Sequence, residues 1–284
     1  MKRRNRLQAA TVAIPGTVAL TAIAHSPRGV AQGGAGGQDP YAAQVDQGLA
    51  YFQGLAQDQL SLAEDLLRVI RSNDIEQAQT AYVRSRPPYE QIEVLAASFE
   101  QTDSDIDARP YSFEGGELDP EFISIHKIEA QIFRDDDLAA AVPYAERLIE
   151  SVRTLISDLN QRQNFSSRKH FEGFDALATE VSAKKISSEE ETWSDRSLLI
   201  FRQNWNGIYR QFEPFAEVLD EPTFAAVRDA YEAAQRVIEP YFREDAIGGA
   251  PYSTIGASVR GEIVRASYHL RDQLQVAAES LQLV

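Results

Sequence analysis

Apolar residues recur at spacings of three and four along almost the whole chain after residue 40. The clearest run consists of Leu60, Ala63, Leu66, Leu67 and Ile70. On a helix each residue turns by about 100°, so such a run forms one apolar stripe that can face a core. No convincing two-residue alternation of apolar and polar positions occurs, and no strand is predicted. The pattern predicts helices over residues 41–72, 74–101, 118–133, 137–162, 169–185, 189–217, 221–243 and 254–282.

Residues that favour turns lie between these predicted helices. Ser72-Asn73-Asp74 indicates the end of one helix and the cap of the next. Pro87-Pro88 is expected to interrupt or kink the second helix, because proline lacks a backbone N–H. Residues 108–120 and 247–251 contain glycine and proline and predict loops. Eight helices are too many for one four-helix bundle, so the predicted fold is all-α, with two packed antiparallel helix bundles over residues 41–284.

The first 40 residues differ from the rest of the chain. A basic start is followed by a mostly apolar stretch at 7–24 and by small residues suited to cleavage, a pattern typical of a secretory signal peptide. We therefore assign residues 1–31 to a signal peptide and the glycine-rich residues 32–40 to a flexible linker. The Arg3-Arg4 pair is compatible with twin-arginine export. The protein is expected to be periplasmic or secreted, and not to span the membrane once the signal is removed.

The composition limits which partners and which metal ligands the protein can have. The chain has 28 basic and 43 acidic residues and a formal net charge of -15, which disfavours a nucleic-acid partner because such partners reward basic patches. It contains no cysteine. Disulfide bonds, thiolate metal ligands and a lipid anchor on an N-terminal cysteine are therefore excluded. Any metal must be held by oxygen atoms and by imidazole nitrogen.

A histidine and a glutamate stand out in the predicted helix 118–133. Its apolar residues gather on one helical face; they are Phe122, Ile125, Ile128, Ile132 and Phe133. Glu129 falls in the middle of that face, and His126 lies at its edge. An ionised carboxylate on a buried face is costly unless something pairs with it. The pair is either a hydrogen-bonded pair near the core or part of a metal site.

Further acidic residues precede this pair. Glu90 and Glu93 are three apart, so both can project from the same side of a helix, and Asp107 follows in the next segment. Helical bundles build metal sites by projecting carboxylates and histidines from facing helices. Oxygen and imidazole ligands of this kind suit iron, zinc, copper or manganese. The alternative for Glu90 and Glu93 is a solvated helix face.

Four sequence blocks together resemble a known family. The blocks are PYEQIE at 88–93, DIDAR at 105–109, HKIE at 126–129 and EVSAKKISSEEETWSDRSLLIF at 180–201. In this order they resemble the imelysin-like domain of EfeO and EfeM proteins, over about half of the chain. The chain departs from the family pattern at Asp195 and Ser197, where the family has histidine and aspartate.

The resemblance implies a periplasmic, all-helical component of an EfeUOB-type iron uptake system, in the short EfeM-like form without a cupredoxin domain. Such a protein would bind iron, with zinc or copper as alternatives, and pass it to a membrane permease that works with a periplasmic peroxidase-type partner. Carried over by position, the ligands would be His126 and Glu129. Glu90, Glu93 and Asp107 match acids that the family places around the metal. Glu180 and Glu190 match acids of the later block, and the resemblance leaves open whether either of them is a ligand.

Two other functions remain open at this point. The family is also catalogued among metallopeptidases, but a zincin carries two histidines in H-E-x-x-H. Here only His25, His170 and His269 accompany His126. The second alternative is a metal-free helical protein that binds a polysaccharide or another protein. We expect a binding protein more than an enzyme.

Overall fold

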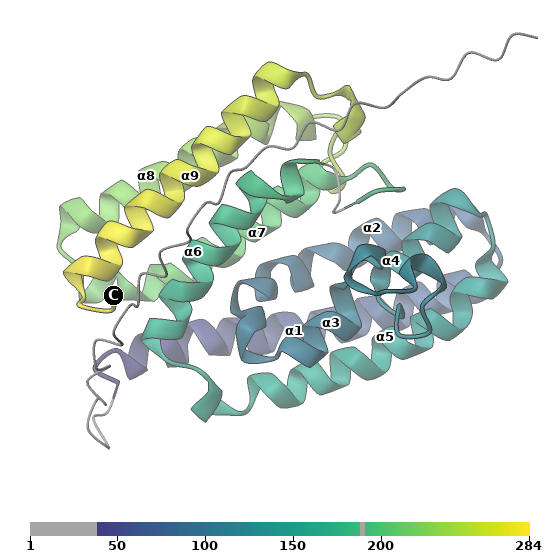
Figure 1. Ribbon diagram of the computed structural model, residues 1–284, viewed down its shortest axis with the longest axis horizontal. Coiled ribbons are helices and arrows are strands. Elements are labelled where there is room, and N and C mark those ends of the chain that lie inside the picture. Colours follow the sequence, from purple (N-terminus) through teal and green to yellow (C-terminus); the bar gives the residue numbers. More distant parts are fainter. Residues whose placement is uncertain (1–38, 188–190) are drawn as a thin grey trace, which may run out of the picture. The chain divides into compact units, whose positions relative to one another are not determined.

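The computed structural model describes residues 39–187 and 191–284. The predicted signal peptide, most of the predicted linker and Glu190 lie outside the described residues. The described chain forms helices and turns without a strand (Figure 1), which confirms the predicted all-α fold. None of these helices is both long and apolar enough to span a membrane. The α-helices are α1 (Ala42–Arg71), α2 (Ile75–Ile92), α3 (Glu100–Asp107), α4 (Ile125–Glu129), α5 (Leu138–Leu159), α6 (Ser167–Ala183), α7 (Ser197–Phe212), α8 (Glu221–Ile238) and α9 (Ala257–Ser280).

The helices pack in two groups (Figure 1). In the first group, α1 packs against α2 and α5, and the short helices α3 and α4 also pack against α5. In the second group, α9 packs against α6 and α8, and α7 packs against the same two helices. The groups meet at a seam, where α2 packs against α7 and the 3₁₀ helix η1 (Glu93–Ser98) packs against α6. This arrangement agrees with the predicted pair of packed bundles.

The predicted single helix over residues 74–101 was wrong. The helix α2 ends at Ile92, the chain tightens into η1, and α3 begins as a separate helix at Glu100. The reason is tertiary packing, because η1 buries its apolar side chains at the seam instead of extending the stripe of α2. Of the expected interruption or kink at Pro87-Pro88, the interruption does not occur, since α2 continues through both prolines. The buried residues Tyr89 and Ile92 beyond them hold this last part of the helix in the core.

The predicted helix over residues 118–133 is shorter than expected. The helix α4 begins after Ser124, whose hydroxyl oxygen accepts a hydrogen bond from the backbone N–H of His126 (3.3 Å). A π-helical turn, η4 (Ala130–Arg134), follows directly. Of the five apolar residues that predicted a buried face, Phe133 is half-buried and the other four are buried; these are Phe122, Ile125, Ile128 and Ile132. Turns of this wide type occur frequently at functional sites.

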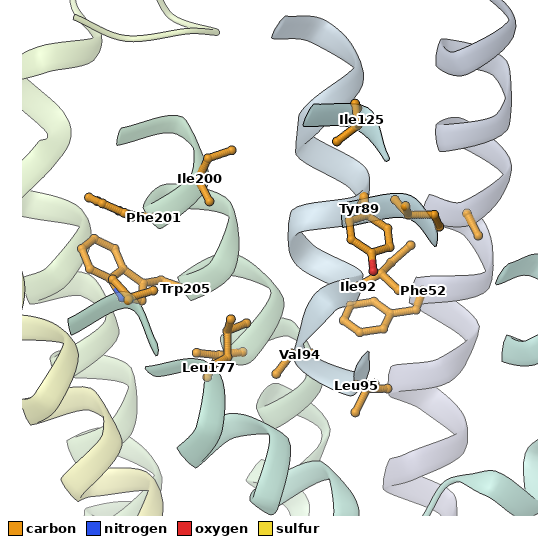
Figure 2. Close-up of a cluster of buried hydrophobic side chains, with 14 of the residues drawn as sticks. Phe52, Tyr89, Ile92, Val94, Leu95, Ile125, Leu177, Ile200, Phe201 and Trp205 are labelled. Atoms are coloured by element: carbon orange, nitrogen blue, oxygen red, sulfur yellow. The ribbon is translucent and has the colours of Figure 1, made fainter. Parts of the chain in front are cut away.

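Two glycines allow the two helical groups to approach closely at the seam. A Cβ atom on Gly173 of α6 would lie 2.0 Å from the carbonyl oxygen of Val94, and one on Gly207 of α7 would lie 2.1 Å from that of Gln91. Any larger residue would force the backbones apart. Figure 2 shows the buried cluster that continues across this seam, from Phe52 and Tyr89 through Val94 to Leu177 and Trp205. The end of α2 is therefore fixed against α6 and α7.

Candidate functional site

The H-x-x-E pair of α4 is buried, and its histidine bridges Glu129 to a second acid, Asp107. His126 Nδ1 lies 3.1 Å from Glu129 Oε2, and His126 Nε2 lies 3.3 Å from Asp107 Oδ1. All three side chains are at most 3% exposed. The imidazole therefore connects a carboxylate of its own helix with one at the end of α3.

The other oxygen of Glu129 accepts two backbone hydrogen bonds. The donors are the N–H groups of Trp193 (2.9 Å) and Ser194 (2.8 Å), in the segment 191–196 that precedes α7. The hydroxyl of Ser194 in turn donates to Glu191. A buried carboxylate is costly without partners. These contacts and His126 together satisfy Glu129.

Asp195 holds the segment 191–196 in place. Its φ is 60°, a left-handed conformation that aspartate tolerates better than most residues. Its carbonyl oxygen accepts the N–H of Tyr252 (2.9 Å), and its carboxylate accepts the N–H of Ser253 (2.8 Å) and the Ser253 hydroxyl. The aspartate that departs from the family pattern thus links this segment to the loop before α9. The second departure, Ser197, is the first residue of α7 and is buried.

Arg86 lies among the carboxylates of the site and was not identified from the sequence. Its Nη2 lies 2.5 Å from Glu90 Oε1, and both of its Nη atoms donate to Asp107 Oδ1 at 3.1 Å. Its Nε lies 2.7 Å from Glu191 Oε1. The arginine side chain is fully buried. The available signal was its position one helical turn before Glu90, since residues four apart on a helix are neighbours.

A second cation pairs with the remaining acid of α2 and η1. The ammonium of Lys185, just after α6, lies 2.7 and 2.8 Å from the two oxygens of Glu93. The amide of Asn204 in α7 donates to Glu90 Oε2 (3.1 Å) and to Glu93 Oε2 (2.8 Å). Glu90 and Glu93 are 0% and 8% exposed, so they do not form a solvated helix face.

Glu180 lies outside the contacts of this network, at the rim of a cavity of about 370 Å³ at the seam. Its side chain is 32% exposed and lies 3.6 Å from Lys184. Glu93 and Asp107 line the same cavity, together with Arg109. The cavity therefore connects the position of Glu180 with the buried acids.

The network sets the protonation of its members. Burial disfavours a charged imidazole, but the contacts with Asp107 and Glu129 outweigh burial and raise the pKa of His126 to about 9. Burial also disfavours an ionised Asp107, yet Arg109 and Arg86 hold the pKa of that carboxyl well below its usual range. At neutral pH the imidazole is therefore cationic and Asp107 is anionic.

The structure brings most of the predicted acids together but pairs them with the protein's own cations. The predicted residues in one buried network are His126, Glu129, Glu90, Glu93 and Asp107. The cations that the sequence did not indicate are Arg86, Arg109 and Lys185. Across residues 39–187 and 191–284, no three His, Asp or Glu side chains are arranged as ligands of one metal ion. The ligand roles therefore stay predictions.

These features define an all-α protein of two packed helical groups with a buried carboxylate–imidazole network at their seam. Residues 48–276 match the family model described as imelysin. The chain belongs to the imelysin family, which confirms the resemblance predicted from the four sequence blocks.

Curated relatives of the chain are named as components of an iron uptake system. The iron uptake system component EfeO of Escherichia coli is 31% identical over 179 residues, which cover 62% of this chain and 48% of that protein. The EfeO of Yersinia pseudotuberculosis is 30% identical over 175 residues, which cover 61% of this chain and 46% of that protein. The chain spans about half the length of the curated relatives it matches.

Proposed function

We propose that this chain is an iron-binding component of an iron uptake system. In this proposal it captures iron at the buried acids around His126 and passes it to a membrane permease. The similarity to proteins named iron uptake system component EfeO supports the assignment to an iron uptake system. The observation that carries the site is the contact of His126 with both Asp107 and Glu129 inside the core.

The charge of the network favours a metal cation once the imidazole of His126 has lost its proton. The carboxylates are Glu90, Glu93, Asp107, Glu129 and Glu191, and the basic side chains paired with them are Arg86, Arg109 and Lys185. At neutral pH the imidazole is cationic, and burial raises the pKa of Glu191 to about 8, so a metal ion at this site would displace both protons. With the imidazole then neutral and all five acids ionised, the acids outnumber these cations by two. Buried charge without a partner is costly. A divalent metal ion would offset this excess, and carboxylate oxygen with imidazole nitrogen suits iron.

The cavity at the seam gives the proposed site a route of entry. Glu93 and Asp107 face it from the network, and Glu180 faces it from the rim. Carboxylates along a cavity attract cations towards its inner end. We assign His126 and Glu129 as ligands, Asp107, Glu90 and Glu93 as supporting acids, and Glu180 as a residue of the entrance.

The proposal also covers the export of the protein and its partner proteins. We propose export through the N-terminal signal, and a membrane permease with a periplasmic peroxidase-type protein as partners. The metallopeptidase alternative would require further ligands for a metal-bound water. In the described chain, His170 contacts the carbonyl oxygen of Ser166 and His269 is exposed on α9, so neither adds an imidazole to the contacts of His126.

A thermal unfolding experiment with peptide hydrolysis as a second readout tests the proposal. Ferrous iron under anaerobic conditions, zinc and copper are each added to the full chain. A ligand at a hundredfold excess over its Kd stabilises a protein by about 2.7 kcal/mol, which for a chain of this size raises the Tm by roughly 5 to 10 °C. We expect such a rise with iron. No rise with any metal supports a metal-free binding protein, and peptide cleavage that a chelator abolishes supports a metallopeptidase.

A further inference from the structure

The guanidinium of Arg86 contacts acids from three separate segments. Glu90 belongs to α2, Asp107 ends α3, and Glu191 lies in the segment 191–196. The two Nη atoms contact Glu90 and Asp107, whereas Nε contacts Glu191. The guanidinium therefore divides its contacts between two acids that the sequence predicted around a metal and one that it did not.

Arg86 and His126 share one oxygen atom. Asp107 Oδ1 lies 3.1 Å from both Nη atoms of Arg86 and 3.3 Å from His126 Nε2. A metal ion bound by the imidazole and Asp107 would therefore stand close to the guanidinium. Two cations in a buried site of low dielectric repel each other strongly. A guanidinium cannot relieve this repulsion by losing its proton.

We propose that Arg86 is a built-in competitor for the cation, so that loading requires its guanidinium to release Glu90 and Asp107. This inference rests on the proposed function and adds a regulation of the same site. Glu191 gives the displaced guanidinium a partner, because its contact with Nε can persist when the Nη contacts are lost. The return of Arg86 to Glu90 and Asp107 then favours release of the metal, which a carrier needs.

The competing explanation is that Arg86 only holds Glu90 and Asp107 in position. The two roles predict opposite effects of removing the charge. Without a competitor, Glu90 and Asp107 become available and the metal binds more tightly. If Arg86 only positions the acids, they separate without it and the metal binds more weakly. Arg86→Lys keeps the positive charge but lacks the planar guanidinium. It therefore distinguishes an effect of the charge from an effect of the shape of the side chain.

Isothermal titration of the full chain tests the inference, with zinc as a redox-inert probe and ferrous iron under anaerobic conditions. Arg86→Gln should bind at least about tenfold more tightly than the wild type, given the size of charge interactions at buried sites. Arg86→Lys should stay close to the wild type. The control is Arg71→Gln, which removes an exposed arginine paired with Glu146 and should change nothing. Equal or weaker binding by Arg86→Gln overturns the inference.

A crystal structure of the zinc-loaded wild type tests the same point without a variant that has to fold. We expect the guanidinium of Arg86 to lie away from Glu90 and Asp107 and to keep Glu191. Retention of all three contacts with zinc bound at His126 overturns the inference and leaves the proposed function intact. If neither the wild type nor Arg86→Gln binds zinc or iron, the proposed function fails and the inference fails with it.

Discussion

Glu129 accepts a hydrogen bond of 2.8 Å from the backbone N–H of Ser194, although 65 residues separate the two in the chain. The bond connects α4 of the first helical group to the segment 191–196, which leads into α7 of the second. Asp195 fixes that segment through Tyr252 and Ser253. The position of the Glu129 carboxylate therefore depends on residues that do not belong to the network itself.

The first prediction concerns this support. Asp195→Ala removes the acceptor for Ser253 and places a residue without a polar side chain at a φ of 60°. We expect the free energy of unfolding to fall by about 1 to 2 kcal/mol and the affinity for a cation to fall several-fold. Urea unfolding and metal titration measure the two effects. Asp195→Asn, which tolerates the same φ, should lose less than half as much stability. Equal losses in both variants would show that the backbone conformation and the acceptor do not matter.

The second prediction concerns the seam. Gly173→Ala places a Cβ atom 2.0 Å from the carbonyl oxygen of Val94, so the backbones must separate. We expect a loss of about 3 kcal/mol in the free energy of unfolding. The matched control is Gly54→Ala in α1, where nothing lies within 4 Å of the added atom. This substitution should stabilise the protein by about 0.5 to 1 kcal/mol, because alanine favours a helix more than glycine does. Chemical denaturation of both variants checks the difference in sign.

The third prediction concerns pH and His170, away from the proposed site. Burial lowers the pKa of this imidazole to about 4, against the hydrogen bonds to Ser166 and Gln211. The ordinary pKa of about 6.5 applies to the unfolded chain, which therefore takes up a proton before the folded chain does. Stability from this residue is complete above pH 6.5 and is lost as the pH falls towards 4. This pKa shift corresponds to about 3 kcal/mol in the free energy of unfolding.

Urea unfolding between pH 4 and 7.5 measures this effect. His170→Gln should remove about 3 kcal/mol of the acid-induced loss of stability. His269→Gln, which changes an exposed imidazole on α9, should follow the wild type at every pH. A difference between the wild type and His170→Gln that stays constant with pH would contradict the role of His170.

Much of the fold could be predicted from the apolar spacing, because that spacing reports which side of a helix is buried. The predicted helix 41–72 corresponds to α1, and 137–162 corresponds to α5, within a few residues. The errors fall where tertiary contacts change the local geometry. The 3₁₀ turn η1 at the seam and the π-turn η4 after Glu129 have no distinct apolar period.

The site could be predicted only in part, for a similar reason. The spacing of three between His126 and Glu129, and between Glu90 and Glu93, is visible in the sequence because each pair belongs to one local segment. Lys185, Asn204 and Glu191 reach the same network from distant segments. One sequence gives no distance between such segments, so the cations that neutralise the acids could not be assigned to them.

The most direct test of the proposed cation site is isothermal titration of the full chain with ferrous iron, under anaerobic conditions, beside the variants His126→Gln and Glu129→Gln. The control is Asp136→Asn, which changes an exposed acid of the turn after η4. We predict that each site variant loses at least about tenfold in affinity, or about 1.4 kcal/mol of binding free energy, while the control binds as the wild type does. Binding that is equally strong in all four proteins would contradict the proposed site.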